Sequence, residues 1–145
     1  MIQNNDEFAN RFARGISKIE RLHKRFMNRA LAQEGITGIA FPYVVTIMKN
    51  PGISQDVLAD SQGVDKSRVA RIVRDLEDGG YITRELSPQN RRQYMVSLSE
   101  NGVALYEMIQ EKSKEWEALV CRNIDEKDLA DAIDTLDRII VNLSE

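Results

Sequence analysis

The order of elements expected between residues 54 and 102 constrains the fold more than any other feature of this 145-residue chain. Two short helical patterns are separated by a turn at Gly63, and the second of them is basic. A glycine pair at residues 79–80 ends that helix. Strand-like runs at residues 81–86 and 93–98 follow, joined by a loop with one proline and two arginines. This order predicts a mainly α fold with a small β-wing, the winged helix-turn-helix.

Capping residues and hydrophobic spacing predict the helix boundaries. Apolar residues recur at helical spacing over residues 8–31, which predicts one long amphipathic helix ending near Gly35. Thr37 is the expected N-cap of the next helix, although Pro42 would then lie inside it and remove one hydrogen bond. The later helices have expected N-caps at Ser54, Asp65, Ser99 and Asp125.

Apolar stripes mark the helices at both ends of the chain. The helix after Ser99 is expected to bury Val103, Tyr106, Ile109, Trp116 and Val120. The last helix carries at helical spacing Leu129, Ile133, Leu136, Ile140 and Leu143. The stripes near both ends of the chain require a partner surface.

The charge of the chain is unevenly distributed. Residues 1–48 carry a net charge of +3, residues 49–98 of +1 and residues 99–145 of −7. Residues 66–74 hold four positive charges and no negative one. A local patch sets the field that phosphates meet, so the mild overall acidity does not exclude DNA binding, and the middle of the chain is the expected contact region.

The composition excludes several classes of protein. One cysteine, Cys121, and one histidine, His23, rule out an intrachain disulfide and argue against a Cys/His metal site, so no cofactor is predicted. Cys121 is expected to be a small buried apolar residue. No apolar run approaches the roughly 18 residues of a membrane span, and residues 1–10 lack a signal-peptide core, so we expect a cytoplasmic protein without a membrane partner. No glycine loop for phosphate and no nucleophile pattern indicates an enzyme.

The helix over residues 66–78 has the chemistry of a DNA-binding element. Its buried side is expected to hold Val69, Ile72, Val73 and Leu76. Its opposite side and flanks present Lys66, Ser67, Arg68, Arg71 and Arg74. One arginine can donate hydrogen bonds to O6 and N7 of the same guanine, and serine can hydrogen-bond to a base or a phosphate. The alternative is a solvated face paired with its neighbouring acids, but the helix-turn-helix context favours DNA.

Two further groups are candidates for DNA contact. Arg91 and Arg92 lie at the tip of the expected wing, where an arginine can enter the narrow minor groove; the alternative is a solvated loop tip. Ser54 and Gln55 open a helix whose free N–H groups could bind phosphate, a property that every helix start shares.

Residues 52–102 resemble the core of the MarR family of transcriptional regulators, and the flanking helices agree with it in number and length. The matching positions are Ile53-Ser54-Gln55, Leu58-Ala59, Asp65-Lys66-Ser67, Val69, Arg71, Leu76-Glu77, Gly80, Arg91-Arg92, Val96, Leu98 and Gly102. The family wing usually has an aspartate before the arginine pair. Here Asn90 stands in that place, which would hold an arginine less firmly, and Arg92 is the expected inserted residue.

The resemblance implies a homodimeric repressor that binds a palindromic double-stranded DNA operator. It implies a single MarR-like domain over residues 1–145, with dimerisation helices at 1–34 and 103–145 and a winged helix DNA-binding region at 37–102. Groove contacts would come from Lys66, Ser67, Arg68 and Arg71, and minor-groove contacts from the wing arginines. The rival class is a winged-helix module that binds protein without binding DNA, which should lack an exposed basic face.

Many members of the family bind a small aromatic or phenolic effector between the dimer helices and the winged domain. The candidate lining residues here are Ile19, His23, Phe41 and Val45. The alternative is that these residues are ordinary core, with His23 as a structural histidine. Other members sense oxidants through a cysteine in the first helix, which is not expected here because Cys121 lies late in the fifth helix.

Overall fold

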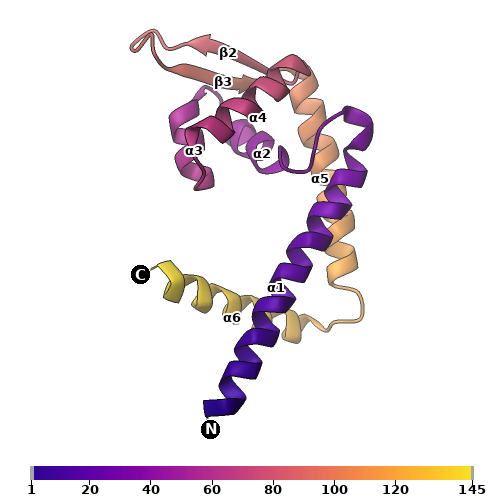
Figure 1. Ribbon diagram of the computed structural model, residues 1–145. Helices are drawn as coiled ribbons and strands as arrows, with labels where there is room; N and C mark the ends of the chain where they lie inside the picture. Colours follow the sequence, from indigo (N-terminus) through magenta and orange to yellow (C-terminus); the bar gives the residue numbers. More distant parts are fainter. Residues whose placement is uncertain (1, 145) are drawn as a thin grey trace. The chain divides into compact units, whose positions relative to one another are not determined.

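The computed structural model describes the backbone of residues 2–144 and the side chains of residues 7–144. The chain is mainly helical with one small antiparallel sheet (Figure 1). The elements are α1 (Ile2–Ala30), η1 (Ala32–Glu34), α2 (Phe41–Lys49), β1 (Ile53–Ser54), α3 (Gln55–Gln62), α4 (Lys66–Asp78), β2 (Ile82–Leu86), β3 (Tyr94–Leu98), α5 (Glu100–Val120) and α6 (Glu126–Ser144). The chain divides after Lys112 into two compact units, and α5 runs from the first into the second.

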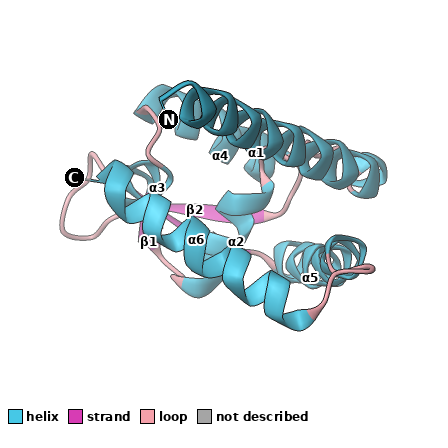
Figure 2. Cartoon of the chain, turned by 90° about the horizontal axis from the view of Figure 1, so that it is seen from below, coloured by secondary structure: helices cyan, strands magenta, loops and turns pink. Residues whose placement is uncertain are grey.

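The sheet has the strand order β1-β3-β2, and Figure 2 shows how little of the chain it occupies. The β2–β3 hairpin confirms the predicted wing and extends beside α4 in Figure 1. The two-residue strand β1 was not predicted; it pairs with β3 through Ile53 and Val96. Gly52 reinforces this pairing, because its N–H donates to the Val96 carbonyl at 3.0 Å and to Ser97 Oγ at 2.8 Å. β1 therefore anchors the start of α3 to the wing.

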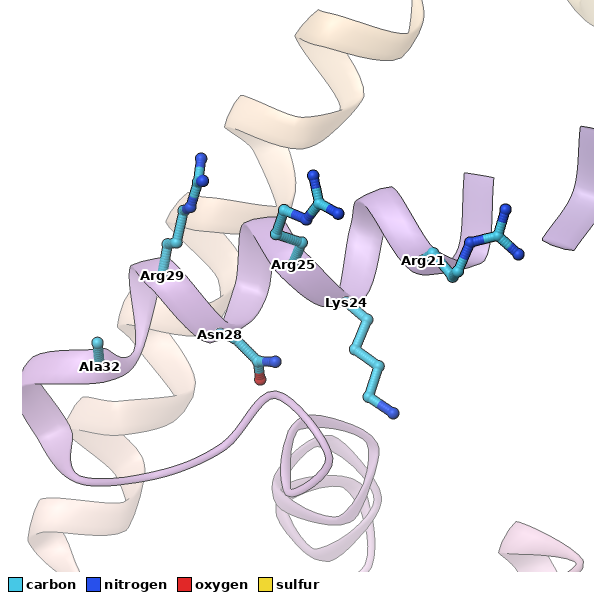
Figure 3. Close-up of a pocket in the computed structure, with 6 residues that line it drawn as sticks. All are labelled: Arg21, Lys24, Arg25, Asn28, Arg29 and Ala32. Carbon is cyan, nitrogen blue, oxygen red and sulfur yellow. The ribbon is translucent and has the colours of Figure 1, made fainter. Parts of the chain in front are cut away.

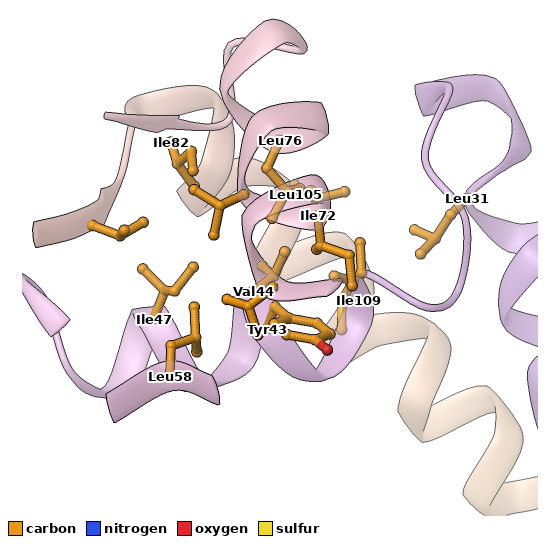
Figure 4. Close-up of a cluster of buried hydrophobic side chains, with 14 of the residues drawn as sticks. Leu31, Tyr43, Val44, Ile47, Leu58, Ile72, Leu76, Ile82, Leu105 and Ile109 are labelled. Carbon is orange, nitrogen blue, oxygen red and sulfur yellow. The ribbon is translucent and has the colours of Figure 1, made fainter. Parts of the chain in front are cut away.

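The core of the first unit is formed by side chains that converge from α2, α3, α4, the sheet and α5 (Figure 4). All four residues predicted for the buried side of α4 belong to it. Leu105 and Ile109 of α5 are both almost fully buried, although only Ile109 was predicted to be. Members with no more than 1% of their surface exposed include Met27, Leu31, Val44, Ile47, Leu58, Val69, Val73, Leu76, Val96 and Ile109.

Four of the five predicted helix N-caps are confirmed, but Thr37 is not the N-cap of α2 and the predicted start of that helix is wrong. α2 begins at Phe41 rather than after Thr37, which places Pro42 in the first turn. A proline there removes no hydrogen bond, because the first N–H groups of a helix have no intrahelical partner. At four helix starts the side-chain oxygen of the predicted cap accepts a backbone N–H group, and these caps are Ser54, Asp65, Ser99 and Asp125.

The C-terminal unit differs from the predicted burial. Trp116 is only half-buried and Val120 is exposed. Cys121, predicted to be buried, is exposed just after the end of α5. None of the described side chains of α6 is buried, and its apolar residue Ile140 is 58% exposed. The apolar stripes of this unit were predicted from the spacing of apolar residues alone. That spacing identifies the apolar side of a helix but not the surface that covers it.

Candidate nucleic-acid interface

The start of α4 is fixed by Asp65. The Ser67 hydroxyl donates to the Asp65 carboxylate, and the backbone N–H of Arg68 donates to the same oxygen at 2.9 Å. These two hydrogen bonds, that of Ser67 first, hold the pKa of the Asp65 carboxyl below its ordinary value. Ser67 therefore has only its oxygen lone pairs left for an outside partner, which suits a base amino group better than a phosphate.

The face of α4 opposite the core is exposed and basic. Arg68, Arg71 and Arg74 are all exposed, whereas Val69 on the packed side of the same helix is completely buried. Among the described residues, no ion pair holds any of these three arginines. Glu77, an acid that could have neutralised this face, is instead paired with Arg84 of β2, with 3.0 Å between Oε2 and Nη2. The structure therefore does not support the alternative in which the arginines of α4 are neutralised by ion pairs with acidic residues of the same helix.

Lys66 differs from the arginines because it has a partner. Its Nζ lies 2.9 Å from Oδ1 of Asp56 in α3, and this carboxylate raises the pKa of Lys66 above its ordinary value. The pair connects the first turns of α3 and α4 across the helix-turn-helix. Both side chains remain at least half exposed, so Lys66 still faces solvent with its charge partly balanced.

Ser54 and Gln55 are placed differently from the exposed residues of α4. Ser54 is only 7% exposed, and its Oγ accepts the N–H of Val57 at 3.2 Å. Gln55 is half-buried, and its Oε1 is buried without a hydrogen-bond partner in the described part of the chain. What this helix start offers to an outside phosphate is therefore its backbone rather than the Ser54 hydroxyl.

The wing tip is a closed loop that exposes both arginines. Ser87 is buried, and its Oγ accepts the N–H groups of Gln89 and Asn90, each at 3.3 Å. The side-chain oxygen of Asn90 accepts the N–H of Arg92 at 3.1 Å. Asn90 thus fixes the backbone of the turn, while the guanidinium groups of Arg91 and Arg92 extend from an exposed surface.

The base of the wing contains a contact that sequence reasoning missed. The Arg84 guanidinium lies 4.4 Å from the centre of the Tyr94 ring on the neighbouring strand, a cation–π geometry. The same side chain forms the ion pair with Glu77 of α4. Arg84 therefore links α4 to both wing strands, and only the strand register brings it to Tyr94.

Two of the four predicted effector residues come together at a surface groove of about 320 Å³. The His23 and Phe41 rings are 6.0 Å apart in an edge-to-face arrangement and both line the groove. Ile19 is 58% exposed on α1 and Val45 packs against the core, and neither lines it. The full lining is Glu20, His23, Lys24, Met27, Gly38, Ile39, Phe41, Pro42, Tyr43, Gln62, Val64 and Arg68.

The described residues contain neither a membrane-spanning helix nor a cluster of metal ligands. No helix among them is long and apolar enough to cross a membrane. Within the same part of the chain, no group of three or more histidine, cysteine and acidic side chains is arranged to hold a metal ion.

Comparison with known proteins identifies the family. Residues 34–93 match the model of the MarR family. A crystal structure of MarR is 32% identical, with a TM-score of 0.80 over 89% of this chain and 88% of that one. The transcriptional regulator SlyA is 26% identical, with a TM-score of 0.83 over 92% and 94%.

A curated relative, the putative transcriptional regulatory protein for the hcr operon of Thauera aromatica, is 35% identical over 80 residues. The match covers 55% of this chain and 48% of the relative, so the chain spans about half of that protein's length. These relatives are transcriptional regulators rather than enzymes. Because the similarity to MarR extends over most of both chains at 32% identity and includes the winged helix-turn-helix, this chain belongs to the MarR family.

Proposed function

We propose that this chain is a sequence-specific transcriptional regulator that binds double-stranded DNA with α4 in the major groove. The observation that carries the proposal is the exposed basic face of α4, with its arginines opposite a side that is packed into the core. A recognition helix needs this division, because the packed side holds it rigidly while the other side meets base edges. Lys66, Ser67, Arg68, Arg71 and Arg74 are the proposed contacts in this groove.

The wing is proposed to contact the adjacent minor groove. Arg91 and Arg92 stand on a turn that is closed by hydrogen bonds to Ser87 and Asn90, so the loop presents them without first having to order itself. A narrow, A/T-rich minor groove has the strongest negative potential and attracts inserted arginines. Of the pair, Arg92 is the proposed inserted residue.

A salt titration tests DNA binding and the role of the wing together. The logarithm of the binding constant of the wild-type chain should fall linearly with the logarithm of salt concentration, by about 0.9 for each phosphate contact. Arg92→Ala should weaken binding, most on operators with A/T-rich flanks. Fluorescence anisotropy on operators that differ only in their flanks measures both effects. A binding constant independent of salt would exclude a DNA-binding function, and unchanged binding by Arg92→Ala on every flank would remove Arg92 from the interface.

The proposed active form is a homodimer on a palindromic operator. Exposed apolar residues on the terminal helices support it, among them Phe8 at 73% and Ile140 at 58% exposure. Within the domain of residues 1–145, we assign dimerisation to residues 1–34 and 103–145 and DNA binding to residues 37–102. A two-fold dimer carries two recognition helices, so its operator has two related half-sites. The proposed action is repression in the cytoplasm.

The groove beside His23 is proposed to bind a small aromatic or phenolic anion that relieves repression. The rings of His23 and Phe41 supply an aromatic wall, and Lys24 and Arg68 supply cations for a carboxylate. Arg68 belongs to α4, so a ligand that pairs with it removes a positive charge from the proposed DNA face. Ligand and DNA would then compete for the same guanidinium group.

Salicylate, a phenolic anion, is a suitable probe of this groove. It should release labelled operator from the wild-type chain and raise transcription of an operator-controlled reporter that the chain represses. Lys24→Gln, which leaves α4 unchanged, should raise the salicylate concentration for half-release about tenfold, since a charge-assisted hydrogen bond is lost. Its operator affinity without salicylate should match that of the wild type. If the wild type and Lys24→Gln respond equally to salicylate, Lys24 is excluded from the site. If the reporter is transcribed less when this protein is absent, the protein is an activator rather than a repressor.

A further inference from the structure

A surface cleft of about 480 Å³ follows the C-terminal half of α1 (Figure 3). It is lined by Arg21, Lys24, Arg25, Asn28, Arg29 and Ala32, all of which are exposed. Their spacing explains its shape, because side chains four residues apart form a ridge along a helix. The three arginines form one ridge, and Lys24, Asn28 and Ala32 form the next. In Figure 3, Arg25 and Arg29 project from one side of the ribbon and Lys24 and Asn28 from the other. We call these six residues the cationic cleft.

The cationic cleft contains four positive charges, and no acidic residue lines it. No ion pair in the described part of the chain reaches any of the four. The nearest acids in the sequence are placed elsewhere: Glu20 lines the groove beside His23, and Glu34 accepts the Tyr81 hydroxyl at 3.1 Å. Like charges four residues apart on a helix repel each other. An anion that contacts both ridges would therefore relieve a repulsion that the described chain does not balance.

Stabilisation of the helix end explains only one of the four cations. A positive charge near the C-terminus of a helix interacts favourably with the last carbonyl groups, but this effect falls off within the last turn. Arg29 is the basic residue in the last turn of α1. Arg21, Lys24 and Arg25 lie before that turn, so the helix end does not account for them.

Asn28 gives the cleft a directed hydrogen-bond donor. Its side-chain oxygen accepts the backbone N–H of Gly38 at 2.5 Å, which fixes the orientation of the amide. The amide NH₂ group is then left to donate to an outside ligand. Guanidinium groups donate pairs of hydrogen bonds to phosphate oxygens, and the ammonium group of Lys24 adds a mobile donor. The cleft therefore presents donors and positive charge, the combination that phosphate oxygens need.

We propose that the cationic cleft binds a ligand with two or three linked phosphates, either free or carried by a nucleotide. Residues 21–29 span only about 12 Å of the helix axis, so the four cations match several adjacent negative charges. A single carboxylate or orthophosphate would leave most of these cations unpaired. The volume of the cleft lies within the range of small-molecule sites. No aromatic residue lines the cleft, so it should recognise the phosphates rather than a base.

Lys24 connects this cleft to the groove beside His23, because it lines both. A bound polyphosphate engages Lys24 and places negative charge beside the groove. The polyphosphate and the aromatic anion proposed for the groove should therefore weaken each other's binding, by the same factor in both directions. Polyphosphate binding itself is independent of the groove, whereas this antagonism rests on the effector site proposed above.

Calorimetric titration of the full chain with pyrophosphate, at about 0.15 M ionic strength, tests the site. The double variant Arg21→Gln with Arg25→Gln should raise the pyrophosphate dissociation constant at least about tenfold, because two charge-assisted contacts are lost. The matched control, Arg11→Gln with Arg14→Gln, removes the same charge from exposed positions of α1 outside the cleft and should bind like the wild type. Orthophosphate should bind the wild type at least about tenfold more weakly than pyrophosphate, since it reaches fewer cations. ADP with an affinity near that of pyrophosphate would show that the phosphates alone are recognised, and a much tighter ADP complex would identify a nucleotide as the source.

The antagonism is measured without DNA, by titrating the chain with salicylate in the presence and absence of saturating pyrophosphate. Pyrophosphate should raise the salicylate dissociation constant of the wild type at least about fivefold. It should have no effect on salicylate binding to Lys24→Gln, because the residue that both ligands share is then absent.

Other outcomes overturn the proposal in distinguishable ways. If pyrophosphate does not bind the wild type, or if the variant and its control lose affinity equally, the cleft is not a specific site. If the variant keeps its pyrophosphate affinity but loses operator affinity, the cleft contacts the DNA backbone instead. Salicylate affinity that pyrophosphate leaves unchanged would disprove the antagonism. A wild-type chain that binds pyrophosphate but not salicylate would refute the effector groove and leave the polyphosphate site standing.

Discussion

Replacing Arg71 with alanine is expected to weaken binding to the selected operator by about 1–3 kcal/mol and to relax base preference at one position of each half-site. Arg71 is exposed on α4, opposite the side that packs into the core, and no ion pair holds it in the described chain. Its removal should therefore delete the proposed DNA contact without disturbing the fold. The loss should be greatest on the best sequence, because a bidentate contact with guanine exists only there.

The measurement compares Arg71→Ala with wild type on the operator selected from random-sequence DNA and on single-base variants of it. Arg122→Ala is the matched control, since it removes the same charge from an exposed position in the acidic C-terminal third of the chain. It should leave both affinity and sequence preference unchanged. Equal weakening of Arg71→Ala on every sequence would make Arg71 a phosphate contact and move the base-reading role to other residues of α4.

The predictable parts of this fold are those set by local chemistry. A capping side chain acts on an N–H group only three residues away, so Ser54, Asp65, Ser99 and Asp125 identified four helix starts correctly. The faces of α4 followed from the helical period in the same way. The start of α2 was placed too early because Thr37 is a suitable cap in isolation, whereas the structure puts Pro42 in the first turn.

The unpredicted parts depend on contacts between distant residues. β1 is only two residues long, and it exists because Ile53 meets Val96 across the sheet. Arg68 lines the groove beside His23 although 45 positions separate them in the sequence. Likewise, Cys121 was expected to be buried from its residue type alone, but it follows the last turn of α5 and is exposed. Neither spacing nor composition contains such information.

Gly102→Ala is expected to lower the free energy of unfolding by about 3 kcal/mol, at the upper end of the cost of overpacking. An added Cβ would lie 1.9 Å from the carbonyl oxygen of Tyr81 and 3.1 Å from Cβ of Leu98. That carbonyl cannot move freely, because it accepts the N–H of Ser99 at 3.0 Å. Ser99 Oγ in turn accepts the N–H of Gly102 at 3.1 Å and donates to the Gly80 carbonyl at 2.6 Å.

Urea unfolding followed by circular dichroism, at one fixed protein concentration because dimerisation changes apparent stability, measures this loss. Gly63→Ala separates steric contact from backbone conformation. Gly63 has a φ of 61° and open space around an added Cβ, so alanine there should cost only about 1 kcal/mol. Equal costs at the two positions would mean that the backbone around Tyr81 yields to the new methyl group. A clearly larger cost at Gly102 would establish that glycine is required there for the close approach of α5 to the wing, not for its φ.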